Sequence, residues 1–236
     1  MVNRTDAGEN DRRLILLTDQ HGLVDVIAKG ARKAGSRLAG ASELMVLAQF
    51  TWAEGRARGY VQHVKPVTSF PGLRKNYDGM MAGIAWCDSV RTYLPIGAPA
   101  DDIFELSVLV LKWLELREDA VPVLVWGLAK MLTDDGVAPD WMSCMVTGER
   151  LTKTPVAFDF SVGGPVDDAE AVSGQVEWVD AEALIGLSRI IELEEPPMKM
   201  KRALEALNLL RKVMEFHTDR RMLALGSLVS DLRSSG

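Results

Sequence analysis

Short apolar runs, separated by segments rich in glycine and charge, occupy roughly the first 70 residues of the chain. Small β barrels and sandwiches give this pattern, because each strand is brief and each turn needs flexible or polar residues. The runs that we expect to form strands are Arg12–Thr18, Leu23–Ala28, Leu44–Trp52 and Tyr60–Val67. The length of the region suits a five-stranded barrel of the OB-fold type.

After Phe70-Pro71-Gly72 the spacing of the apolar residues becomes helical. The expected helices are Tyr77–Tyr93, Ile103–Leu116, Val121–Leu132, Ala181–Leu193, Lys201–Phe216 and Met222–Leu232. Asp101 or Asp102 is expected to cap the second helix and Asp180 the fourth, because their carboxylates can accept hydrogen bonds from free backbone N–H groups. Val121–Leu132 is apolar on almost every side, which predicts a buried helix.

Residues 139–180 interrupt the helices with glycine, proline and two alternating stretches, Val156–Phe160 and Gln175–Val179. This composition predicts a small β lobe. The expected fold class is therefore α+β. An N-terminal OB-fold β-barrel, residues 1–70, is followed by an α-helical domain, residues 71–236, with a small inserted lobe at about 139–180.

The composition is that of an ordinary globular protein, with 236 residues, 47% hydrophobic and 25% charged. The longest apolar run is interrupted by Gly127 and Lys130, and it is shorter than the ~20 residues of a membrane span. The first residues, Met1–Asp11, are polar and do not resemble a signal peptide. We therefore expect a cytoplasmic protein that has no membrane partner.

Charge is distributed unevenly along the chain, although the net charge is −6. Residues 1–75 carry 12 Lys and Arg against 7 Asp and Glu, whereas residues 76–236 carry 15 against 26. An asymmetry of this kind indicates that the first part of the chain handles a polyanion.

Three basic clusters account for this excess, and they are the candidate nucleic-acid-binding residues. They are Lys29, Arg32, Lys33 and Arg37, then Arg56 and Arg58, then Arg74 and Lys75. Cationic loops neutralise phosphates and release counterions, so three such clusters on one barrel predict a groove that binds a nucleic-acid strand. Trp52 and Tyr60 flank the second cluster, and one of them is a candidate for stacking on bases.

Catalytic chemistry finds no support in the sequence. The three histidines, His21, His63 and His217, are far apart, and there is no Gly-x-Ser-x-Gly elbow or phosphate-loop motif. Adjacent aspartates such as Asp134-Asp135 are typical of caps and solvated loops rather than of a shared site. We expect no catalytic residues, no enzyme activity and no cofactor.

Metal binding is not expected either. The chain has two cysteines, Cys87 and Cys144, which excludes a disulfide framework and a four-cysteine zinc site. Thr147 stands where a zinc knuckle beginning at Cys144 would need a second cysteine, while Asp167 and Glu170 stand near the place of a second pair. One thiolate with two carboxylates is an unusual structural zinc set, so we expect a buried free thiol at Cys144.

Several stretches resemble the RecO family of bacterial DNA repair and recombination mediators. The stretches are Gly8–Arg12, Leu16–Leu23, Ala28–Lys33 with Ser36-Arg37-Leu38 and Gly40, Ser69–Arg74, and Glu215-Phe216-His217 followed by Arg220-Arg221. Their order and spacing run through the whole chain.

The resemblance implies an OB barrel, a helical domain with a small zinc lobe, and a protein without enzyme activity. It implies binding and annealing of single- and double-stranded DNA, and RecA loading together with RecR. It also implies contact with the C-terminal tail of single-stranded-DNA-binding protein, for which the helical domain would provide an apolar site. Lys29, Arg32, Lys33 and Arg37 match the family's basic motif, so the resemblance implies that they contact the DNA backbone.

Two departures from the family pattern matter. Of the four zinc cysteines common in the family, only Cys144 is matched, which implies a lobe retained without zinc. Only Met1–Thr5 precede the turn that follows the family's first strand, so we expect that strand to be short or missing and to leave an open barrel edge.

A second hypothesis stays open beside the DNA-binding mediator. The overall negative charge and the altered zinc lobe would also fit an interaction scaffold that has lost DNA binding. A hydrolase has no recognisable site in the sequence.

Overall fold

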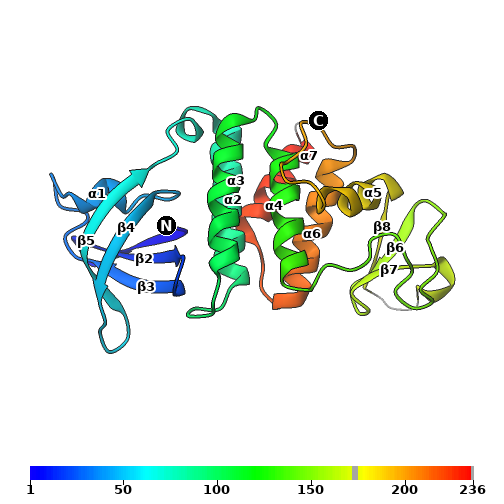
Figure 1. The fold of residues 1–236 in the computed structure, drawn as a ribbon, viewed down its shortest axis with the longest axis horizontal. Coiled ribbons are helices and arrows are strands. Elements are labelled where there is room, and N and C mark those ends of the chain that lie inside the picture. Colours follow the sequence, from blue (N-terminus) through cyan, green and yellow to red (C-terminus); the bar gives the residue numbers. More distant parts are fainter. Residues whose placement is uncertain (172–174, 235–236) are drawn as a thin grey trace. The chain divides into compact units, whose positions relative to one another are not determined.

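A five-stranded sheet forms the first part of the structure, a computed structural model that describes residues 1–171 and 175–234. Its strands are β1 (Asn3–Ala7), β2 (Asp11–Thr18), β3 (Gly22–Ala28), β4 (Leu47–Ala53) and β5 (Gly59–Thr68). Their order is β1-β2-β3-β5-β4, with β3 and β5 parallel and all other neighbours antiparallel (Figure 1). Strands β2 to β5 lie at the four predicted runs, and the α+β class is confirmed.

The strand β1 is present and short, so of the two expected alternatives, a short or a missing strand, the short strand is the one found. All five of its residues pair with β2, from Asn3 opposite Ile15 to Ala7 opposite Asp11. The expected open edge is found, because no ladder joins β1 to β4 in the described residues. At this seam the recorded backbone bonds are Met45 N–H to the Met1 carbonyl and the Met1 ammonium to the Val46 carbonyl, both 3.0 Å.

The core of this sheet explains the continuous apolar run in β2. Leu14 and Leu16 pack with Val26 and Ala28 inside the curved sheet. Ile15 and Leu17 point to the other face and are also buried, and helix α3 (Asp101–Leu116) packs against β2. A strand that is covered on both faces shows little alternation of apolar and polar residues.

Two helices complete the first compact unit, which comprises residues 1–118 and 222–225. They are α2 (Tyr77–Tyr93), capped by the Asn76 side chain, and α3. The predicted cap of α3 is wrong, because Ala100 occupies the N-cap and Asp101 and Asp102 lie in the first helical turn. Carboxylates there still interact favourably with the helix dipole. Two short helical turns, α1 (Leu38–Ala41) and Leu73–Lys75, were not predicted.

The second compact unit comprises residues 119–221 and 226–236. Its helices are α4 (Ala120–Asp134), α5 (Ala181–Ile190), α6 (Ala203–Thr218) and most of α7 (Leu223–Ser234). The predicted burial of α4 and the predicted cap of α5 by Asp180 are both confirmed. No helix in the described residues is long and apolar enough to span a bilayer.

A small three-stranded sheet forms the predicted lobe of the second unit. Its strands are β6 (Val156–Asp159), β7 (Gly164–Val166) and β8 (Val176–Val179), in the order β7-β6-β8. Residues 172–174 of the predicted lobe lie outside the described residues. The predicted domain boundary between residues 70 and 71 falls inside the first compact unit.

Candidate nucleic-acid interface

The loop that follows β3 carries the first basic cluster. Its first residues are hydrogen-bonded to the β1–β2 turn and to the first residue of β2. The backbone N–H of Gly30 donates to Asp11 Oδ1 (2.8 Å), and that of Arg32 donates to the Asn10 carbonyl (2.9 Å). Gly30 has a φ of 68°, a left-handed conformation that glycine adopts without strain. The loop therefore leaves the sheet in a fixed direction.

The cations of this loop differ in whether they form hydrogen bonds or ion pairs within the protein. Arg32 Nη1 donates to the Gly8 carbonyl (3.1 Å) and lies 3.4 Å from the Asp6 carboxylate. Lys33 and Arg37 are exposed, and the described residues offer neither of them an ion pair. The charges of Lys33 and Arg37 are therefore available to an external anion.

Arg58 of the second cluster shares one carboxylate with an arginine that sequence analysis missed. Arg13 donates to both oxygens of Asp25 (2.9 and 2.8 Å), and Arg58 Nε donates to Asp25 Oδ2 (2.8 Å). Burial alone would raise the pKa of Asp25, but the hydrogen bonds and charges of the two arginines outweigh it and hold the pKa below its usual value. Two guanidinium groups on one carboxylate leave a surplus of one positive charge. Only the fold could reveal this group, because Arg13 and Arg58 are far apart in sequence.

Tyr60 brings the first two basic clusters together. The parallel contact of β3 with β5 places Ile27 opposite Tyr60, and Lys29 Nζ lies 4.8 Å from the centre of the Tyr60 ring. The chain of the β4–β5 turn also lies close to this ring, because a Cβ on Gly55 would be only 2.8 Å from Tyr60 Cε2. Tyr60 is 42% exposed, so it is the flanking aromatic that lies beside the cations. Trp52 is half-buried and contacts His21, with ring centres 5.5 Å apart.

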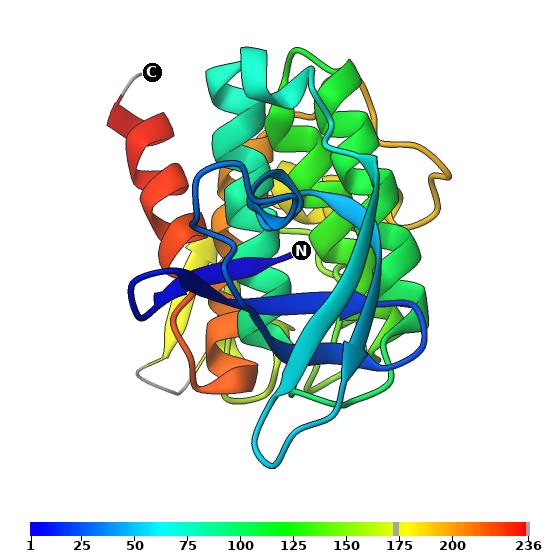
Figure 2. The same ribbon diagram turned by 90° about the vertical axis from the view of Figure 1, so that its left-hand side faces the viewer.

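The turn of the β4–β5 hairpin carries Arg56, and it projects beyond the other strands of the sheet (Figure 2). Arg56 is exposed and has no ion pair with the described residues. We call the surface formed by Arg13, Lys29, Arg32, Lys33, Arg37, Arg56 and Arg58 the basic face.

The third predicted cluster lies at the other end of β5. Arg74 Nη2 donates to the carbonyl of Leu44 (2.7 Å), in the segment that links α1 to β4. Lys75 is exposed beside it. In the described residues, no direct bond links this pair to the other two clusters.

The lobe of the second unit shows why its residues do not fit a zinc site. The Cys144 sulfur accepts hydrogen bonds from the Thr147 hydroxyl and from backbone N–H groups, including that of Asp167 at 3.4 Å. Burial would raise the pKa of this thiol, but these donors together hold it below its usual value. Within the described residues, no three His, Cys, Asp or Glu side chains are grouped as metal ligands. At the position where a zinc knuckle would have a second cysteine, the Thr147 hydroxyl instead donates a hydrogen bond to the Cys144 sulfur.

Comparison with known proteins covers nearly the whole chain. Residues 1–70 match the family model described as Recombination protein O N terminal, and residues 74–225 match the one described as Recombination protein O C terminal. The two models therefore meet close to the predicted boundary between the barrel and the helical region.

Relatives named DNA repair protein RecO are similar to the chain at about 30% identity. The one from Synechococcus sp. (strain JA-3-3Ab) is 30% identical over 244 residues, which cover 94% of this chain and 80% of the relative. The one from Gloeobacter violaceus is 27% identical over 231 residues, covering 94% and 88%. The one from Trichodesmium erythraeum is 30% identical over 182 residues, covering 70% of this chain but only 63% of the relative.

Proposed function

The chain belongs to the RecO family of DNA repair proteins, and from this premise we propose that it binds DNA backbones on the basic face and acts without catalysis. The observation that supports this proposal is a set of exposed cations on the barrel, several of which have no carboxylate partner in the described residues. The contact of Lys29 with Tyr60, beside the β4–β5 turn, brings the first two clusters together. Strands β2 and β3 and the loops beside them are also the surface on which OB-folds bind oligonucleotides.

The proposed mechanism is electrostatic. Lys33, Arg37 and Arg56 would neutralise phosphates and release counterions, so binding requires no particular base sequence. Two strands held beside the same cations repel each other less, which favours annealing of complementary strands. Both single- and double-stranded DNA present the phosphates that such a surface needs.

We propose that the protein works in the cytoplasm with RecR to load RecA, and that it contacts the C-terminal tail of single-stranded-DNA-binding protein. The family membership and the basic face support this assignment. The competing proposal is a scaffold without DNA binding, which the net charge of −6 favours.

A salt-dependent binding measurement with matched variants tests the proposal. Fluorescence anisotropy of a labelled single-stranded oligonucleotide is measured at low and moderate salt with the wild type and with Lys33→Glu/Arg37→Glu. We expect the wild-type affinity to fall steeply with salt, and the double variant to bind roughly tenfold to a hundredfold more weakly at low salt. Annealing of complementary oligonucleotides should slow in parallel.

The matched control is Arg150→Glu/Lys153→Glu, which changes the charge by the same amount on exposed residues of the lobe. It should leave DNA affinity unchanged. Wild-type protein that fails to bind at low salt, or equal affinities of the two double variants, would favour the scaffold.

A further inference from the structure

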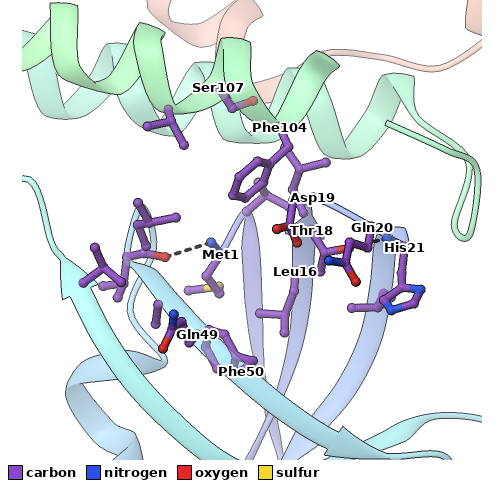
Figure 3. A pocket seen from close by; sticks show the side chains of 18 of the residues that line it. Met1, Leu16, Thr18, Asp19, Gln20, His21, Gln49, Phe50, Phe104 and Ser107 are labelled. Carbon is purple, nitrogen blue, oxygen red and sulfur yellow. Dashed lines mark hydrogen bonds between the residues drawn. The ribbon is translucent and has the colours of Figure 1, made fainter. Parts of the chain in front are cut away.

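A large cavity lies in the first unit, beside the open edge of the barrel. Its volume is about 960 Å³. Apolar side chains form much of its wall, including Phe50 from β4 and Phe104 from α3, while Thr18, Gln20 and His21 lie on the side of the β2–β3 turn (Figure 3). Cavities of this size accommodate drug-sized molecules or short peptides. It lies apart from the basic face, none of whose residues lines it.

The cavity follows the free edge of β4 rather than one of its faces. Every residue from Met45 to Trp52 lines it. Side chains alternate between the two faces of a strand, so a cavity over one face would be lined chiefly by every second residue. In the described residues β4 pairs only with β5. Beyond the two bonds that Met1 makes with Met45 and Val46, just before β4, its other edge therefore offers unpaired backbone N–H and carbonyl groups. An unpaired edge of this kind is a template for a further strand.

Two buried donors that line the cavity have no hydrogen-bond partner among the described residues. They are Trp86 Nε1, on a side chain with no exposure, and Ser107 Oγ, on a residue 6% exposed. A buried polar group without a hydrogen bond costs about 1–3 kcal/mol, so an occupant that supplies acceptors would be favoured. Carbonyl groups of an extended peptide are acceptors of this kind.

The charge of the lining selects against anions. Two carboxylates, those of Asp19 and Glu54, line the cavity together with one cation, the Met1 ammonium, which is bonded to the Val46 carbonyl. Among the described residues, no lysine or arginine lines it. Because the two carboxylates outnumber the single ammonium, the lining favours an uncharged or basic segment over an acidic one.

We propose that this cavity is a docking site for an extended, apolar peptide segment of a partner protein that lacks acidic side chains. The segment adds to the barrel as a strand and pairs with the free edge of β4, a recognised mode of peptide binding. Its apolar side chains contact Phe50 and Phe104. This site is independent of DNA binding on the basic face.

The test uses synthetic peptides about six residues long, close to the length of β4. The first alternates valine and threonine, ends with one lysine and has blocked termini. The second has the same sequence with N-methyl groups on alternate residues, which removes strand pairing but keeps the side chains. The third has glutamate in place of lysine and of one threonine. Affinity is measured by calorimetry, and protection of the backbone amides of residues 47–53 by hydrogen exchange.

We expect the first peptide to bind and to protect amides of β4. The N-methylated and acidic peptides should bind at least about tenfold more weakly, because they lose hydrogen bonds or gain repulsion. Equal binding of the N-methylated peptide, equal or tighter binding of the acidic peptide, no binding of the first peptide, or binding without protection of β4 would each overturn the proposal.

Two variants of α3 provide a matched pair. Val108→Trp places a large ring on a residue that lines the cavity and should abolish peptide binding. Leu109→Trp adds the same ring at an exposed neighbour that does not line the cavity, and should leave binding intact. If Val108→Trp fails to fold, Ser107→Ala keeps the cavity, removes one donor and should weaken binding severalfold. Lys33→Glu/Arg37→Glu should bind the peptide normally, which separates this proposal from the proposed DNA binding.

Discussion

The two β-sheets of the molecule differ in charge and in where their polar groups point. Residues 1–75, around the five-stranded sheet, carry 12 Lys and Arg against 7 Asp and Glu, whereas the lobe at 139–180 carries 2 against 8. In the barrel the basic side chains stay at the surface, and in the lobe the donors around Cys144 turn inward onto its sulfur. Two regions built from short strands can therefore serve different purposes. The barrel leaves its charged groups exposed, whereas the lobe uses its polar groups to stabilise its own fold.

The largest effect on stability is expected from a substitution in the core of the lobe. Phe158 is fully buried, with ring centres 6.1 Å from Trp141 and 5.1 Å from Phe160. Phe158→Ala should lower the free energy of unfolding of the second unit by about 3–5 kcal/mol, as measured by urea denaturation. DNA affinity should not change, because the basic face belongs to the other unit. A loss of DNA affinity in a folded Phe158→Ala protein would show that the lobe takes part in binding.

A smaller effect is expected from removing the carboxylate inside the basic face. Asp25→Asn should raise DNA affinity roughly threefold at low salt, because one opposing charge is lost. It should also lower the free energy of unfolding at neutral pH by about 1 kcal/mol, since both arginine partners are partly exposed and screened.

The stabilisation that Asp25 provides should depend on pH, because only its ionised form pairs with the two arginines. The pKa of Asp25 is lower in the folded protein than its usual value. Its stabilisation is therefore complete above about pH 4 and is lost as the pH falls below that. Urea denaturation at a series of pH values should show the wild type approaching the variant under acid conditions. A difference that is constant with pH would contradict this assignment.

The smallest effect is expected at the thiol of the lobe. Thr147→Val removes the hydroxyl that donates to Cys144 and should raise the pKa of that thiol, because one donor that favours the thiolate is lost. Ultraviolet absorbance of the thiolate during a pH titration measures this change. Burial raises the pKa of Cys87, in the first unit, to about 11, so its titration lies well above that of Cys144 and serves as an internal reference. An unchanged titration in the variant would mean that the backbone donors alone set the pKa.

Local sequence signals predicted the helices well, but they carried no information on which strands pair. α2 begins at Tyr77 and ends at Tyr93, as expected, because its periodic apolar residues are followed by a proline at position 95. In contrast, β1 has a polar sequence without alternation, and it is a strand because β2 pairs with it. The expected cap at Asp101 or Asp102 was wrong because α3 begins at Asp101, two residues before the expected start at Ile103.

The basic clusters could be predicted from composition, but their grouping could not. Lys29 and Tyr60 meet because β3 and β5 are parallel neighbours, a long-range pairing with no local signature. The role of Arg13 depends on Asp25 and on Arg58, which lies 33 residues further along the chain from that carboxylate. The free edge of β4 is likewise a property of the strand order, because its sequence suggests only an apolar strand.

The short segment Met222–Leu225 has a consequence for how this protein is made. Met222 and Leu225 are fully buried in the first unit, and the Asp88 carboxylate accepts a hydrogen bond from the backbone N–H of Ala224 (3.0 Å). During synthesis, residues 1–118 leave the ribosome long before this segment does. The first unit therefore cannot complete its own core until the second has been almost entirely translated. A fragment ending at Glu118 would lack this segment and expose the apolar surface that the segment covers.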